Sequence, residues 1–170
     1  MTENAPNQRP VISLGLSPAV VAVELAGAIA ILVSILLIVQ FWEVLPDRIP
    51  IHFGFSGLAD AWGDKVMIWL LPAVAAIVFA VLTAASRYGH TFKYPVRITD
   101  ENAQRQYLLA RGLLVLLKAE VCWLFAFVVR QQILVALGNA QRFSIELVWG
   151  MIVLILGTVA VYLLKAYSAR

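Results

Sequence analysis

The sequence predicts an all-α membrane protein with four transmembrane helices and a short ordered extracytoplasmic cap between the first two. Hydrophobic residues make up 62% of the 170 residues and charged residues only 14%, against about 45–50% and about 25% in ordinary globular chains. The apolar residues also gather in four long runs. A water-soluble core could not hide so much apolar surface in a chain of this length, whereas a lipid bilayer can surround it.

The four runs have the length that a membrane span requires, about 20 residues for a hydrocarbon core of about 30 Å. The first begins at Ser17 and Pro18, a capping residue followed by a proline at the first helical position. A cap and an acidic first turn are predicted for the third helix by Thr99, Asp100 and Glu101. We expect spans at about 17–42, 66–86, 107–130 and 144–165 within a single domain over 17–170, with an N-terminal tail at 1–16, a cap loop at 43–65 and a second loop at 87–106.

Lysine and arginine predict the orientation, because short cytoplasmic loops carry an excess of these residues. One side of the membrane would carry eight of them: Arg9, Arg87, Lys93, Arg97, Arg105, Arg111, Lys165 and Arg170. The other side would carry four: Arg48, Lys65, Arg130 and Arg142. We therefore expect the 1–16 tail, the 87–106 loop and both termini in the cytoplasm, and the 43–65 loop outside.

Composition and motifs exclude several classes of function. The formal charge of +3 does not indicate a nucleic-acid partner, because the basic residues border apolar runs, where anionic lipid headgroups would meet them. No residue spacing indicates a zinc site, a catalytic triad or a metalloprotease helix. The two histidines, His52 and His90, are expected on opposite sides of the membrane and cannot cooperate. We expect no enzyme activity, no catalytic residue, no cofactor and no metal.

Small residues recur every four positions in the first two spans. Ala22, Ala26, Ala30 and Ser34 do so in the first span, and Ala76, Ala80 and Ala84 in the second. Small residues at this spacing let helix backbones approach closely. The pattern predicts that spans one and two form a tightly packed hairpin, although chance in an alanine-rich chain would also produce it.

The 43–65 loop has more sequence pattern than a connector needs. Pro46 and Pro50 favour extended backbone before them. Ile51, Phe53 and Phe55 then alternate with His52 and Gly54, the period of a short strand with one apolar face. Turns are indicated by Gly57, Asp60 and Gly63. We expect this loop to fold back as a cap over the outer end of the helices.

His52 is the most informative side chain of the cap. Histidine is a residue type used in proteins as a pH-responsive or ligand-binding group, and His52 could serve as one. Asp47, Asp60 and Asp64 are close in sequence and could tune His52 or share a cation with it. The alternative is a structural histidine that is hydrogen-bonded across a turn of the loop.

The sequence of the cap follows a pattern that is also found in other proteins. Residues 45–53 read Leu-Pro-x-x-Ile-Pro-x-His-Phe and are followed by Gly57, Asp60, Trp62, Gly63 and Lys65. This pattern resembles the signature of a bacterial membrane-domain family of unknown function, best known from the Sdp-type immunity membrane proteins, which protect a producing cell from its own toxin and relay its presence. The stretch from Tyr94 to Tyr107, Tyr-Pro-Val-x-Ile-Thr-x-Glu-Asn-x-x-Arg-Gln-Tyr, is similar to a motif in stand-alone members of that family.

The resemblance implies a multi-pass protein of the bacterial plasma membrane with a role in ligand binding, sensing, immunity or signalling. It supplies no catalytic residues. The candidate binding residues of the cap are His52, Asp47, Pro50, Gly57, Asp60, Trp62 and Lys65.

Three charged residues are expected inside the membrane. Glu24 lies about 9 Å past the start of the first span, and Lys118 about the same distance past Gly112, where the third helix is expected to enter the bilayer. Both helices run in the same direction, so the two charges could face each other at equal depth. Pairing would relieve much of the roughly 2.5–3.5 kcal/mol that a lone charge costs there. Glu120 lies about 200° around the helix from Lys118 and needs another partner or a proton. A structural ion pair, a functional proton or ion site, and snorkelling to the interface remain open alternatives.

The inner side carries a polar stretch before the third span. Arg97, Arg105 and Arg111 fit the binding of anionic lipid at the membrane surface. Asn102, Arg105 and Gln106 could instead dock a cytoplasmic partner. The sequence does not decide between these.

Two functions follow. The leading hypothesis is a non-enzymatic protein that acts in ligand binding, sensing or immunity and signalling through the cap, with a peptide or a protein as a possible partner. The alternative is a small proton-coupled transporter that works as a homo-oligomer, with Glu24 as the coupling carboxylate.

Overall fold

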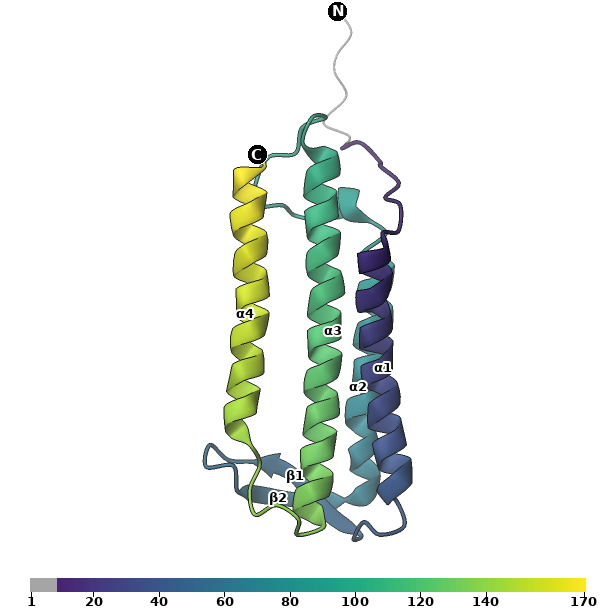
Figure 1. The fold of residues 1–170 in the computed structure, drawn as a ribbon, viewed down its shortest axis with the longest axis vertical. Helices are drawn as coiled ribbons and strands as arrows, with labels where there is room; N and C mark the ends of the chain where they lie inside the picture. Colours follow the sequence, from purple (N-terminus) through teal and green to yellow (C-terminus); the bar gives the residue numbers. More distant parts are fainter. Residues whose placement is uncertain (1–8) are drawn as a thin grey trace, which may run out of the picture.

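The computed structural model describes residues 9–170 and forms a bundle of four long helices capped at one end (Figure 1). The helices are α1 (Pro18–Phe41), α2 (Leu70–Ala85), α3 (Ala103–Ala136) and α4 (Ile145–Ser168). The 3₁₀ turn η1 (Lys65–Trp69) leads into α2, and the two together form one span. This span and the other three helices are each long and apolar enough to cross a membrane. The predicted all-α membrane fold with four spans is confirmed. Residues 1–8 of the predicted 1–16 tail lie outside the described residues.

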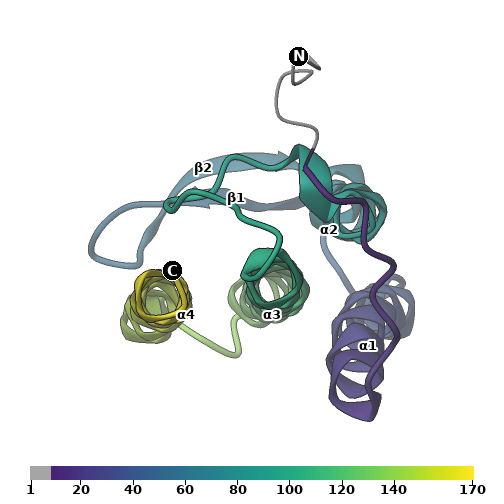
Figure 2. The same ribbon diagram turned by 90° about the horizontal axis from the view of Figure 1, so that it is seen from above.

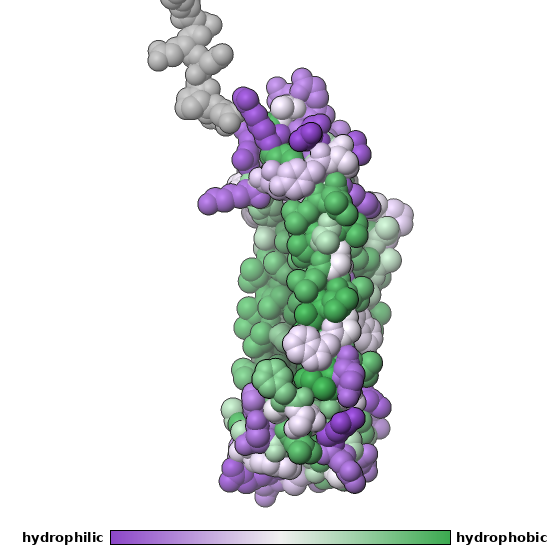
Figure 3. All heavy atoms as spheres, turned by 90° about the vertical axis from the view of Figure 1, so that its left-hand side faces the viewer, coloured by the Kyte–Doolittle hydropathy of each residue, from purple (hydrophilic) through white to green (hydrophobic). Residues whose placement is uncertain are grey.

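The surface is divided into one apolar zone between two polar ends. Figure 3 shows this on the side of the molecule that carries α4, where a green apolar zone separates the purple ends. In the most apolar stretch of α4, no residue is buried within the protein. Val153, Leu154 and Leu156 are all more than half exposed. Apolar side chains on this scale are stable only against lipid or another protein.

Helix α3 is the centre of the bundle. Seen from above, it lies between α4 on one side and the α1 and α2 pair on the other (Figure 2). Both α1 and α2 pack mainly along α3, and much less against each other. The expected tight hairpin of α1 and α2 is therefore wrong.

The small residues explain why α3 takes the central place. The predicted stripe of α2 (Ala76, Ala80 and Ala84) is exposed, whereas Ala75, one position away, is fully buried. Ala75 packs in one cluster with Ala30 of α1 and with Cys122 and Ala126 of α3. The small residues of α3 thus receive both neighbouring helices.

One glycine fixes how closely α1 approaches. A Cβ atom on Gly27 would lie 3.4 Å from the Cα atom of Ala119 and 3.0 Å from the ring of Phe79. Any larger residue would have to push either the backbone of α3 or the Phe79 side chain away. Gly27 therefore marks the point where α1, α2 and α3 meet.

The cap is a two-stranded antiparallel hairpin at the end of the bundle opposite the C-terminus (Figure 1). Strands β1 (Arg48–Phe53) and β2 (Ala59–Asp64) form it, and its turn extends beyond α4. The expected cap between the first two spans is confirmed. Its apolar side is not the predicted one, because Ile49 and Pro50 are buried while Ile51 is partly exposed and Phe55 is 91% exposed. The register shift between Pro50 and His52 breaks the simple alternation.

The cap is fastened to the helices at three points. Ile49 is buried in a cluster with Ile38, Ile68, Val129 and Ile133. The side-chain amide of Gln132 on α3 donates a 3.2 Å hydrogen bond to the carbonyl of Pro50. The backbone N–H of Phe143, in the loop between α3 and α4, donates a 2.7 Å hydrogen bond to the carbonyl of Gly57. The hairpin is therefore held rigidly over the ends of the helices.

Helix α3 begins after the predicted cap and acidic first turn at 99–101, and it ends later than the predicted span at 107–130. It starts at Ala103, because Thr99 and Asn102 bond to each other in a turn and leave Asp100 and Glu101 outside the helix. It continues to Ala136, past the predicted end near 130, because Val129 and Ile133 bury their side chains under the cap. A short 3₁₀ turn, η2 (Gly89–Thr91), precedes it on the terminus side.

Gly57 should be the least replaceable glycine of the cap. It has a φ of +78°, and an added Cβ would overlap the carbonyl oxygen of Phe143. Gly138 has a similar φ of +72° with open space around it. We expect Gly138→Ala to cost roughly 1–2 kcal/mol of strain, and Gly57→Ala to cost roughly 1–3 kcal/mol more from overlap.

Both variants can be compared in thermal unfolding, followed by the reaction of the buried Cys122 thiol with a thiol-specific dye. Gly150→Ala, in α4 with open space around it, is the control and should be neutral or slightly stabilising. Equal losses for Gly57→Ala and Gly138→Ala would show that the contact with Phe143 contributes nothing.

Candidate functional site

The exposed face of the cap carries a histidine–aspartate pair. The Nδ1 atom of His52 on β1 lies 2.5 Å from the Oδ1 atom of Asp60 on β2, and the two side chains are 68% and 53% exposed. The pair joins the strands across the hairpin near its turn. Both polar groups stay open to solvent while the strands beneath them are fixed.

The other two aspartates of the cap, Asp47 and Asp64, interact with other groups than His52. Asp47 lies 3.8 Å from the Nζ atom of Lys65, which also sits 4.9 Å from the centre of the Trp42 ring. The Oδ1 atom of Asp64 accepts a 2.8 Å hydrogen bond from the N–H of Val66 and so caps η1. Within residues 9–170, no group of three or more His, Cys, Asp and Glu side chains could hold a metal ion. The alternative of a cation shared among the aspartates has no geometric support.

The remaining cap candidates divide into buried and exposed. Pro50 is fully buried, and Gly57 contacts the α3–α4 loop. Lys65 is mostly covered, with 23% of its side chain exposed. Trp62 is 46% exposed on β2, and its backbone carbonyl accepts a 2.8 Å hydrogen bond from Arg48. Among these candidates, His52, Asp60, Trp62 and the 99% exposed Asp47 offer side chains to a molecule outside the cap, while Pro50, Gly57 and Lys65 build it.

The intramembrane charges Glu24 and Lys118 form an ion pair between α1 and α3. The Lys118 side chain is only 1% exposed, and that of Glu24 is 24% exposed. Lys118 also donates a 2.6 Å hydrogen bond to the hydroxyl of Thr83 on α2, and its Nζ lies 4.5 Å from the centre of the Phe79 ring. Three helices thus meet at one cation, and snorkelling of Lys118 is excluded.

Glu120 points to the opposite side of α3. The hydroxyl of Thr158 on α4 donates a 2.6 Å hydrogen bond to its Oε1 atom. Its Oε2 atom is buried and has no partner among the described residues. Glu120 lies two residues after Lys118 and was expected to need a partner of its own, and Thr158 is that partner. The hydrogen bond also joins α4 to the bundle inside the apolar layer.

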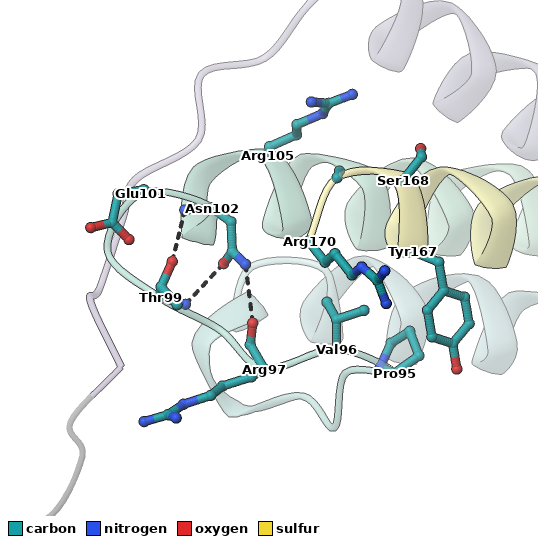
Figure 4. A pocket seen from close by; sticks show the side chains of 11 residues that line it. Pro95, Val96, Arg97, Thr99, Glu101, Asn102, Arg105, Tyr167, Ser168 and Arg170 are labelled. Carbon is teal, nitrogen blue, oxygen red and sulfur yellow. Dashed lines mark hydrogen bonds between the residues drawn. The ribbon is translucent and has the colours of Figure 1, made fainter.

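At the terminus side, Asn102 organises the loop before α3 (Figure 4). Its side-chain oxygen accepts a 2.9 Å hydrogen bond from the N–H of Thr99, and its amide donates a 3.0 Å hydrogen bond to the carbonyl of Arg97. The hydroxyl of Thr99 holds the pKa of the exposed Glu101 carboxyl below its usual value by hydrogen bonding. A cavity of about 710 Å³ borders this loop, but the side chains of Arg97 and Arg105 point away from each other.

Gln106, also at the terminus side, connects α3 to the end of α4. Its amide nitrogen donates hydrogen bonds of 2.9 and 3.1 Å to the carbonyls of Ala166 and Ala169 at the end of α4, and the side chain is fully buried. It cannot dock a partner. Of the four candidates on this face, only Arg97 and Arg105 present exposed side chains.

Several residues that complete these sites carried no signal in the sequence. Thr83 and Phe79 complete the surroundings of Lys118, Thr158 serves Glu120, and Gln132 and Phe143 fasten the cap. Each lies far along the chain from the residue that it contacts. A polar residue within an apolar run, such as Thr83 or Thr158, is the one weak signal that could have marked some of them.

One comparison with known proteins gives a match. Residues 29–76 are similar to a family described as "Domain of unknown function (DUF1648)". The matched range contains the second half of α1, the whole cap and the start of α2, and it supports a membrane domain of a family without a known function. No curated protein and no solved structure matches the chain.

The ion pair of Glu24 and Lys118 can be tested by a double-mutant cycle. Glu24→Gln leaves a buried, unpaired cation and should cost about 2.5–3.5 kcal/mol. Lys118→Met leaves the partly exposed Glu24 and should cost less. We expect the double variant to be more stable than Glu24→Gln alone, because no lone charge remains.

Thermal unfolding in detergent, followed through Cys122 as above, measures all three variants against the wild type. Losses in the double variant that equal the sum of the two single losses would contradict a direct interaction.

Proposed function

We propose that this chain is a non-enzymatic membrane protein that binds an extracytoplasmic peptide through the exposed face of the cap. The observation that carries the proposal is the His52–Asp60 pair, which stays open to solvent on a hairpin that is fastened to the helices at three points. A mere connector between α1 and α2 needs neither the fastening nor the exposed pair. A rigid surface loses little conformational entropy when it binds a ligand.

The strand β2 suggests how a peptide would bind. Its side chains alternate between partly buried and exposed, with Asp60, Trp62 and Asp64 on the exposed side. Among residues 9–170 the sheet has two strands, and α3 packs mainly against β1. An extended peptide could therefore add to the free edge of β2 through main-chain hydrogen bonds. The two carboxylates favour a peptide with basic residues.

Location and wider role belong to the same proposal. The excess of lysine and arginine at the end that carries the C-terminus supports a cytoplasmic position for the termini, with the cap outside a bacterial plasma membrane. The family match covers the cap with the second half of α1 and the start of α2. Together with the resemblance to Sdp-type immunity membrane proteins, this favours immunity to, or signalling by, a secreted peptide.

The test compares a strain that lacks the gene with strains that carry the wild type, His52→Ala or Asp60→Ala. Each is grown in the peptide fraction of conditioned medium from wild-type cells. We expect the two variants to fail to restore wild-type growth, because they remove the exposed pair without disturbing a buried contact. Labelling of membranes from each strain confirms equal protein levels.

His90→Ala is the matched control, because His90 lies at the opposite end of the bundle, and it should restore growth fully. If His52→Ala and Asp60→Ala restore growth as well as the wild type does, the cap is structural and the proposal fails.

A proton-coupled transporter remains the second candidate, since the carboxylate of Glu24 borders a cavity. We rank it lower because Lys118 already pairs with that carboxylate. We expect proteoliposomes with an internal pH-sensitive dye to show no proton flux above that of protein-free vesicles. Flux in the wild type that is lost in Glu24→Gln would reverse this ranking.

A further inference from the structure

A second cavity lies at the terminus side, apart from the cap, and is open along the exposed face of α1 at Val21, Leu25 and Ala28. Its volume is about 670 Å³, and it lies between α1, α2, the first turns of α3 and the segment before α1. Apolar side chains form much of its wall, among them Val21, Leu25 and Phe79. Ala28, ten residues into α1, also borders it, so the cavity reaches about 15 Å into the apolar layer.

The polar end of this cavity contains a buried cation without a counter-charge. Arg111 is 7% exposed. It donates hydrogen bonds of 3.0 and 2.9 Å to the carbonyls of Leu14 and Gly15. Among residues 9–170, no carboxylate oxygen lies within 4.0 Å of its guanidinium group. A buried charge is normally paired, so an anion from outside the chain would complete this site.

Two further groups at this end favour an anion. Arg87, which follows the end of α2, lines the cavity as Arg111 does. Tyr107 lines it too, is 1% exposed, and its hydroxyl has no hydrogen-bond partner among the described residues. The charge of Glu24, which also lines the cavity, is balanced by Lys118. The net charge around the cavity is therefore positive.

We infer that this cavity binds one anionic phospholipid from the leaflet on the terminus side. The phosphate lies near Arg111, Arg87 and the hydroxyl of Tyr107, and an acyl chain follows the apolar wall along Val21, Leu25 and Phe79. Five N–H donors are available on Arg111, and the two carbonyls account for two of them. The 710 Å³ cavity at the same end lacks this arrangement, because its arginines diverge. The inference does not depend on the cap.

Native mass spectrometry of the full chain in mild detergent tests the inference. We expect one phosphatidylglycerol molecule to bind, and a phosphatidylcholine with the same chains to bind more weakly. Inorganic phosphate should compete only weakly, because it lacks the acyl chain. Equal binding of the two lipids, or equal competition by inorganic phosphate, would overturn the inference.

Variants locate the site. Tyr107→Phe should weaken phosphatidylglycerol binding roughly tenfold, as expected for one lost hydrogen bond to a charged group. Arg111→Gln should weaken it more. Because Arg111 also holds the segment before α1, Ala28→Phe, which fills the cavity, provides an independent variant and should abolish binding. Arg105→Gln removes the same charge outside the cavity and should change the affinity less than twofold. A loss in Arg105→Gln that matches the loss in Tyr107→Phe would place the lipid on the outer surface and refute the site.

Discussion

The bilayer admits polar groups only where the protein itself satisfies them, and this constraint accounts for the central position of α3. The buried charged side chains of the bundle, Arg111 and Lys118, lie on this helix, as does Glu120. Each is met by a different neighbour: the segment before α1 for Arg111, α1 and α2 for Lys118, and α4 for Glu120. Because its polar side chains point in three directions and need protein partners in the bilayer, α3 must be surrounded by other helices. The more apolar helices α1, α2 and α4 take these positions.

The same constraint explains how the ends of the bundle differ. At the cap end, Ile49 extends the apolar core past the helices, and hydrogen bonds from Gln132 and Phe143 satisfy hairpin carbonyls. At the terminus end, Gln106 satisfies carbonyls at the end of α4. In the loop before α3, the Tyr94 hydroxyl donates a 2.8 Å hydrogen bond to the carbonyl of Gly89, and burial raises the pKa of this hydroxyl.

The two proposed sites use opposite ends and opposite chemistry. The cap offers exposed carboxylates and an imidazole on a fixed surface, which suits a soluble peptide. The terminus-side cavity offers buried cationic and hydroxyl donors above an apolar wall, which suits a lipid. Arg111 bonds to the backbone before α1, and Lys118 pairs with Glu24 on α1 itself, so the cavity borders the helix that leads to the cap.

The sequence by itself determined the membrane class, the four spans, the presence of a cap and the need of Lys118 and Glu120 for separate partners, because these depend on hydrophobicity, length and helical period. The tertiary structure alone decided which helices meet. The small-residue stripe of α2 predicted a hairpin with α1, but Ala75 packs on α3 instead. The spacing of small residues shows that a helix surface can pack closely, but it does not show which helix packs there. The role of each cap residue, the partners Thr83 and Thr158, and the cavity at Arg111 likewise depend on contacts between distant segments, which no local pattern records.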